Sequence, residues 1–313
     1  MTQTTPLPSP RNSSAVPRQP CWHGLALLAV LWAGMSTAFP ADAPELPRLN
    51  EVSGSPRLPG KFVWVDLVTD DAAAARKFYA RLFGWKFRGS GGYAIATIDD
   101  RPVCGILQEP RPAEAPQALP RWFGYISVNN VGRAERAVIQ GGGRVLAAPA
   151  KFPKRGEQAI LADPEGALFG VIKSSSGDPR DYLAEPGDWI WAQLMSHDAR
   201  KAAEFYRSVA GYEVVENTQT NRLNDIVLAS EGFARATVGT IPDTFTDVKP
   251  HWLPFVRVKN VRESVALATQ LGGKALLEPS PELFESRLAV IADVTGAAIG
   301  LLEWNPEELQ GGR

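Results

Sequence analysis

Residues 62–85 of this chain share a pattern with residues 189–212, and this internal repeat constrains the fold more than any other feature of the sequence. The two copies are 127 positions apart, as measured from Phe78 to Phe205. The matched residues are Asp71, Ala75, Phe78, Tyr79 and Gly84, which recur as Asp198, Ala202, Phe205, Tyr206 and Gly211. Self-similarity at a fixed spacing indicates duplicated structural units. The chain is therefore predicted to be a tandem duplication.

Each copy begins with alternating residues typical of a strand and then changes to a helical period. Ala75, Phe78, Tyr79 and Leu82 are spaced i, i+3, i+4 and i+7, which gives a helix one apolar face to bury. Asp70 or Asp71 in the first copy, and Asp198 in the second, can cap the helix by accepting exposed backbone N–H groups. Gly84 and Gly211 suit a left-handed C-terminal cap.

A second repeat has an offset of 130 positions and follows each of the first units. Its matched residues include Val131, Gly142, Asp163 and Gly166, which recur as Val261, Gly272, Asp293 and Gly296. Each unit has one strand, one helix and further short strands bounded by turn residues. The sequence therefore predicts four βαβββ modules that pair into two domains, an α+β fold.

The strand, the Asp-capped helix with Phe-Tyr and the following Phe83-Gly-Trp85 or Ala210-Gly-Tyr212 resemble the vicinal-oxygen-chelate superfamily. That superfamily includes glyoxalase I, extradiol dioxygenases and bleomycin-resistance proteins, and the resemblance is to its bacterial tandem two-domain, glyoxalase-like branch. It covers roughly residues 60 to 305. It implies that two modules curl into an eight-stranded open cup, so that the chain forms two tandem cups.

The regions outside the repeats differ in composition and set the expected domain boundaries. Residues 1–38 are predicted to be a signal peptide, because arginines precede the short apolar stretch 24–35 and small residues follow it. We further expect an extended leader at 39–60, a first domain at 61–174, a linker at 175–186, a second domain at 187–305 and a tail at 306–313. The protein is thus expected to be periplasmic or secreted, with no stable membrane insertion after signal cleavage.

The resemblance also specifies where metal ligands would lie, and this chain lacks them there. The family's His positions correspond to Trp64, Phe123, Trp191 and Leu253, seven residues before each helix cap. The family's Glu positions that can be aligned correspond to Gly170 and Gly300. Because a divalent metal needs several converging His or carboxylate ligands, no metal site and no cofactor are predicted. A divalent metal held elsewhere is not excluded.

Side chains two apart on a strand share a face, so the residues at and beside the lost ligand positions should line the cups. The expected ligand-binding residues are Trp64, Asp66, Phe123 and Tyr125 in the first cup and Trp191, Gln193, Leu253 and Phe255 in the second. Aromatic walls with few polar groups suit an apolar or planar small molecule. Asp66 is the candidate catalytic residue, because a carboxylate in an aromatic cup is costly unless it is solvated, hydrogen-bonded or shifted in pKa.

Three hypotheses about function stay open. The leading one is an exported, metal-independent protein that binds a small apolar or aromatic molecule. The alternative is an enzyme, either a lyase or isomerase with Asp66 as general base or a dioxygenase with a rearranged site. In the third, the aromatic residues fill both cups as core and the domains serve protein interactions. A formal net charge of −1 with no long basic run makes nucleic acid an unexpected partner. Either a monomer or a homodimer is compatible with the duplication.

Overall fold

The computed structural model describes residues 46–50, 53–89, 92–111, 120–216 and 226–305. The predicted signal peptide at 1–38, residues 39–45 and 51–52 of the predicted leader and the predicted tail at 306–313 lie outside these residues. Within the described ranges, none of the helices has the length and apolar character needed to cross a membrane.

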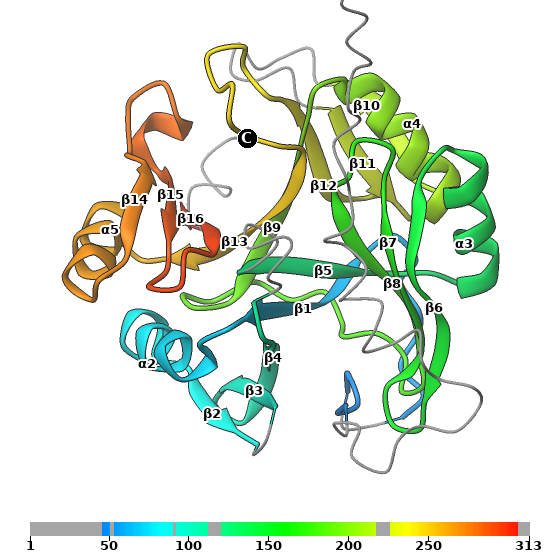
Figure 1. Ribbon diagram of the computed structural model, residues 1–313, viewed down its shortest axis with the longest axis horizontal. Helices are drawn as coiled ribbons and strands as arrows, with labels where there is room; N and C mark the ends of the chain where they lie inside the picture. The colour runs from blue at the N-terminus through cyan, green and yellow to red at the C-terminus, as the bar shows by residue number, and fades with distance from the viewer. Residues whose placement is uncertain (1–45, 51–52, 90–91, 112–119, 217–225, 306–313) are drawn as a thin grey trace, which may run out of the picture.

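The first domain is an eight-stranded mixed sheet in the order β2-β3-β4-β1-β5-β8-β7-β6 (Figure 1). Strand β1 pairs in parallel with β4 and antiparallel with β5, which joins the two modules at the centre of the sheet. The elements are β1 (Phe62–Thr69), α2 (Ala72–Phe83), β2 (Lys86–Arg88), β3 (Tyr93–Ile98), β4 (Arg101–Gln108), β5 (Arg121–Ser127), α3 (Val131–Gln140), β6 (Arg144–Phe152), β7 (Gly156–Ala162) and β8 (Leu168–Ser174).

The second domain repeats this topology in the order β10-β11-β12-β9-β13-β16-β15-β14. Its elements are β9 (Trp189–Ser196), α4 (Ala199–Ala210), β10 (Glu213–Glu216), β11 (Ile226–Ser230), β12 (Phe233–Thr240), β13 (His251–Val258), α5 (Val261–Gln270), β14 (Lys274–Leu277), the 3-10 turn η3 (Phe284–Ser286), β15 (Leu288–Ala292) and β16 (Ala298–Glu303). The prediction of an α+β fold with four βαβββ modules paired into two eight-stranded sheets is confirmed.

Helices α2 and α4 begin at aspartates that the sequence predicted as caps. Asp71 accepts a hydrogen bond from the backbone N–H of Ala74, and Asp198 accepts one from Lys201. Gly84 and Gly211 end α2 and α4 with φ of 73° and 78°, a left-handed conformation that glycine adopts at little cost. Short-range signals therefore determine where these helices start and stop.

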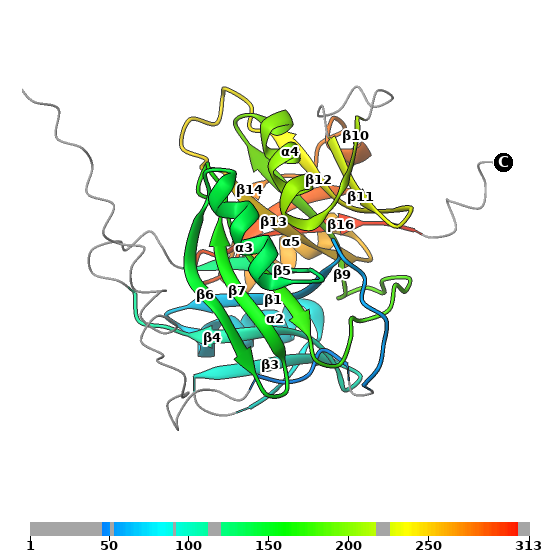
Figure 2. The ribbon, with the colours of Figure 1, turned by 90° about the vertical axis from the view of Figure 1, so that its right-hand side faces the viewer.

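The helices of one domain pack against those of the other. In Figure 1, α2 lies beside α5 and α3 beside α4, and Figure 2 shows α3 and α4 on the same side of the molecule. One buried cluster combines residues of the second and third modules, including Val138 and Phe205. Another combines the first and fourth, including Phe78 and Val265. The main hydrophobic core therefore lies between the domains, on the helix-covered sheet faces.

Each sheet has a second face that points away from the helices, and we call it the inner face. The first inner face carries a separate cluster around Trp64, Phe123 and Tyr125. The second inner face carries a cluster around Leu253, Phe255 and Leu288. All the residues that the sequence predicted to line the cups lie on these two faces.

Candidate functional site

The first inner face brings together the four residues that the sequence predicted for it. Strands β1 and β5 pair so that Trp64 lies opposite Tyr125 and Asp66 opposite Phe123. All four are buried, and the rings of Phe123 and Tyr125 are 5.3 Å apart between centroids. Their assignment as ligand-binding residues stays a prediction.

Asp66 is buried, with 6% of its surface exposed, and its carboxylate is held by hydrogen bonds. Its Oδ1 atom accepts one from Trp64 Nε1 at 2.8 Å and one from Tyr93 Oη at 2.8 Å. Burial, and then the negative charge of Asp66, raises the pKa of Tyr93 well above its usual range, so that the phenol keeps its proton for this bond. The cost of burying Asp66 is thus offset by donors rather than by open solvent.

Arg155 adds a buried positive charge to this network, with 2% of its surface exposed. Its Nη2 atom donates to Tyr93 Oη at 3.2 Å, and its guanidinium lies 4.3 Å from the ring centroid of Trp64. Tyr93 therefore connects Asp66 to Arg155. Neither Tyr93 nor Arg155 was predicted from the sequence as a partner of Asp66. The alternation of side chains along β3 is a signal that places Tyr93 on the inner face. The sequence contains no comparable local signal for Arg155, because it lies in the β6–β7 turn.

The leader covers part of the first inner face. Leu49 is buried in the same cluster as Trp64, Phe123 and Tyr125. Leu46, three residues earlier, is buried against Tyr93 and Phe152. These contacts remove apolar surface of both the leader and the sheet from water, which holds the leader in place. In this structure the first inner face is therefore filled in part by the chain's own leucines.

On the second inner face, the described residues include no buried ion network like that of Asp66 and Arg155. Leu253, Phe255 and Gln193 are buried, whereas Trp191 is half-buried and donates a hydrogen bond to Thr237 Oγ1 at 3.0 Å. Around them lie further half-buried apolar side chains, namely Ile190, Leu277, Val290, Ala298 and Leu302. This face thus combines a half-buried indole with aliphatic surroundings and polar side chains at Gln193 and Thr237.

The family positions for metal ligands do not fit a metal in this chain. Gly170 pairs with Tyr125, and Gly300 with Phe255, across adjacent parallel strands. A Cβ atom added at either glycine would overlap the neighbouring aromatic ring. The rings occupy the space that a longer side chain would need, so no carboxylate could replace these glycines without repacking.

Nor does another cluster of ligands replace them within the described part of the chain. These residues contain no group of three or more His, Cys, Asp or Glu side chains placed to hold a metal ion. His251, at the start of β13, makes a 2.7 Å hydrogen bond between its Nδ1 atom and the backbone carbonyl of Lys249, and burial lowers its pKa.

Sequence relatives support the resemblance. The family model described as "Glyoxalase/Bleomycin resistance protein/Dioxygenase superfamily" matches residues 61–171. A Mycobacterium tuberculosis protein named "Putative glyoxylase CFP32" is 31% identical over 252 residues, which cover 78% of this chain and 95% of that protein. The anthracycline biosynthesis protein DauV of a Streptomyces species is 28% identical over 260 residues, covering 78% and 94%.

Solved structures share the fold at low sequence identity. The Mn(II)-bound glyoxalase from Novosphingobium aromaticivorans is similar with a TM-score of 0.51 and 16% identity, over 79% of this chain and 82% of that one. A variant of homoprotocatechuate 2,3-dioxygenase from B. fuscum gives 0.55 and 13%, over 84% and 75%. The duplicated modules, the two sheets and the relative with 31% identity together show that this chain belongs to the glyoxalase/bleomycin-resistance/dioxygenase superfamily.

Proposed function

We propose that this glyoxalase-like protein binds a small apolar or aromatic molecule on its second inner face, without a metal ion. The observation that carries the proposal is the contrast between the two faces. Leu49 and the Asp66 network occupy the centre of the first, whereas the second keeps Trp191 half-buried among aliphatic side chains. Apolar surface that is not fully buried by its own chain favours an apolar ligand.

The polar side chains of the second inner face would orient such a ligand. The hydrogen bond from Trp191 Nε1 to Thr237 Oγ1 holds the indole in one orientation, so its ring offers a fixed surface for stacking. Gln193 pairs with Thr237 across strands β9 and β12, which brings its amide to the same part of the face. An apolar site with a few polar groups is typical of small-molecule binding sites.

Export to the periplasm or the medium is part of this proposal and rests on the predicted signal peptide at 1–38. The proposal also includes a monomeric or homodimeric assembly, because the duplication already supplies two paired domains in one chain. The relative DauV is named for anthracycline biosynthesis, which agrees with a small-molecule ligand.

The test is calorimetric titration of the purified protein with neutral naphthalene-2-methanol, together with elemental analysis of the same sample. We expect binding to the wild type, and roughly tenfold weaker binding to Trp191→Ala, since stacking contributes on the order of 1 kcal/mol beyond burial. The matched control is Trp64→Phe in the first domain, which should leave the affinity unchanged. Stoichiometric zinc, iron, nickel or manganese would contradict metal independence, and an unchanged affinity in Trp191→Ala would contradict the site.

One observation favours an enzymatic alternative, namely the buried Asp66 carboxylate beside the Tyr93 hydroxyl. A lyase or isomerase would use Asp66 as general base. Asp66→Asn should then abolish turnover of a glyoxalase-type substrate, such as the hemithioacetal of methylglyoxal, while circular dichroism shows a folded protein. Turnover retained in the folded variant would exclude that role.

A further inference from the structure

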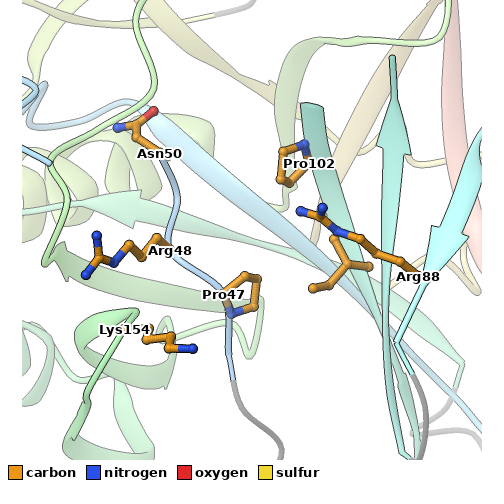
Figure 3. A pocket seen from close by; sticks show the side chains of 7 residues that line it. Pro47, Arg48, Asn50, Arg88, Pro102 and Lys154 are labelled. Atoms are coloured by element: carbon orange, nitrogen blue, oxygen red, sulfur yellow. The ribbon is translucent and has the colours of Figure 1, made fainter. Parts of the chain in front are cut away.

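A cavity of about 470 Å³ lies where the leader crosses the first domain. Its lining comes from the leader, from strands β2, β3 and β4 and from the β6–β7 turn (Figure 3). Figure 3 shows Arg48 and Lys154 on one side of Pro47 and Arg88 on the other. A volume of this size is in the range of small-molecule sites. It lies at the β2–β4 side of the first inner face, where Ile95 packs against the cluster of Trp64, Phe123 and Tyr125, and its described lining contains none of the residues of the second inner face.

The cavity is cationic. Three of its lining residues are Arg48, Arg88 and Lys154, and none of the described lining residues is acidic. An anion placed among three cationic side chains gains favourable electrostatic interactions. The other walls include apolar Pro47, Ile95 and Pro102, which favour an organic body over a bare ion.

The leader is held so that Arg48 faces this cavity. Leu46 is anchored against Tyr93 and Phe152, and Leu49 against the aromatic cluster of the first inner face. The two residues that flank Pro47 and Arg48 are thus buried on the sheet side. A hydrogen bond from Arg48 Nη1 to Ser53 Oγ at 3.2 Å further restricts the arginine.

The same end of the domain has buried donors without acceptors. Arg155 Nε and Gln158 Nε2 have no hydrogen-bond partner among the described residues, and both side chains are 2% exposed. Lys154 and Arg155 are consecutive residues of the β6–β7 turn. Lys154 lines the cavity, whereas Arg155 is buried in the interior of the domain.

We propose that this cavity binds a small organic anion. Its carboxylate lies among Arg48, Arg88 and Lys154, and its apolar part packs on Pro47, Ile95 and Pro102. Charge-assisted hydrogen bonds from arginine supply the affinity. The site exists only with the leader in place, because Pro47, Arg48 and Asn50 belong to the leader.

The experiment is a set of calorimetric titrations of the full chain with 2-naphthoate, neutral 2-naphthamide and inorganic phosphate. We expect naphthoate to bind more tightly than either of the others, and its dissociation constant to rise between 50 and 500 mM NaCl. Arg48→Gln and Arg88→Gln should each weaken naphthoate binding by roughly tenfold, the loss expected for one charge-assisted contact. Phosphate that binds as tightly as naphthoate would contradict the contribution of the apolar walls.

Lys86→Gln is the matched control, because it removes a positive charge from the same short strand β2 but does not line the cavity. It should leave the affinity for naphthoate unchanged. An equal loss of naphthoate affinity in Lys86→Gln and Arg88→Gln would show that only the net charge of the protein matters, and it would overturn the proposal. Naphthoate affinity that is unchanged in both Arg48→Gln and Arg88→Gln would overturn it as well. Trp191→Ala separates this site from the second inner face, since it should weaken naphthalene-2-methanol binding and leave naphthoate binding intact.

Discussion

The hydroxyl of Tyr79 donates a hydrogen bond to Asp293 Oδ2 at 2.9 Å, although the two residues are 214 positions apart. The duplicated counterpart is the bond from Tyr206 to Asp163 Oδ2 at 3.2 Å. Each tyrosine also accepts a hydrogen bond from a tryptophan of its own domain, Trp122 Nε1 or Trp252 Nε1. The residues that revealed the repeat in the sequence therefore connect the two domains in the structure.

Loss of one of these tyrosine hydroxyls should destabilise the whole chain. Tyr79→Phe removes the hydrogen bonds that Tyr79 makes with Trp122 Nε1 and with Asp293 Oδ2, while Asp293 Oδ1 keeps its bonds to the following turn, and the change costs about 1–3 kcal/mol. Urea unfolding followed by circular dichroism measures the change. Tyr182→Phe, at an exposed linker position, is the control and should cost under about 0.5 kcal/mol. Equal midpoints for the two variants would contradict a cross-domain role for Tyr79.

Asp163 makes stability depend on pH. Burial raises its pKa from 3.8 to about 6. A carboxyl group with a raised folded-state pKa stabilises the fold fully below its unfolded pKa, and this contribution is lost as the pH rises through the folded pKa. We expect a loss of up to about 3 kcal/mol between pH 4 and pH 7 from this group.

The measurement for Asp163 is urea unfolding at several pH values between 4 and 7, for the wild type and for Asp163→Asn. The asparagine variant cannot titrate at this position, so its stability should depend less steeply on pH over this window. Parallel curves for the two proteins would show that Asp163 does not titrate as expected. Asp198→Asn, which changes an exposed cap, controls for loss of a carboxylate as such.

Gly170 should not tolerate a side chain. Gly170→Ala places a Cβ atom against the ring of Tyr125, and overpacking of this kind costs about 1–3 kcal/mol. Thermal or urea unfolding measures the loss, and Tyr125→Leu in the same chain should recover part of it. Gly132→Ala is the control, since its helix position has room for a methyl group and alanine favours helix, with a gain of about 0.5–1 kcal/mol. A neutral Gly170→Ala would contradict the argument that the ring fills the ligand position.

Asp66 and Arg155 should depend on each other for stability. Asp66→Asn leaves Arg155 as a buried charge without its counter-charge, which costs roughly 3–5 kcal/mol. Arg155→Met in the Asp66→Asn background should recover much of the loss, because no buried charge then remains. A double-mutant cycle measured by urea unfolding gives the coupling, and strictly additive effects would show that the two groups do not interact through Tyr93.

The alternation of side chains along a strand predicts which residues of that strand share a sheet face, but not which other segments they meet there. Trp64, Asp66, Phe123 and Tyr125 meet on one face because alternation along β1 and β5 fixes the facing of each side chain. Tyr93 and Arg155 complete that network, but they arrive from β3 and from the β6–β7 turn, and which segments meet there depends on the sheet order. Likewise, Leu46 and Leu49 gave no sign in the sequence that the leader would pack on the first inner face.

The sequence by itself determined the four modules, their helix boundaries and the absence of ligands at the family metal positions. These properties follow from local rules, since caps, glycine turns and the spacing of apolar residues act within a few positions. Only the tertiary structure decided that the domains join through Tyr79–Asp293 and Tyr206–Asp163. It also decided that the leader covers part of the first inner face while Trp191 stays half-buried on the second. The physical reason is that burial and hydrogen bonding between distant segments depend on how whole sheets and helices pack, which local patterns do not encode.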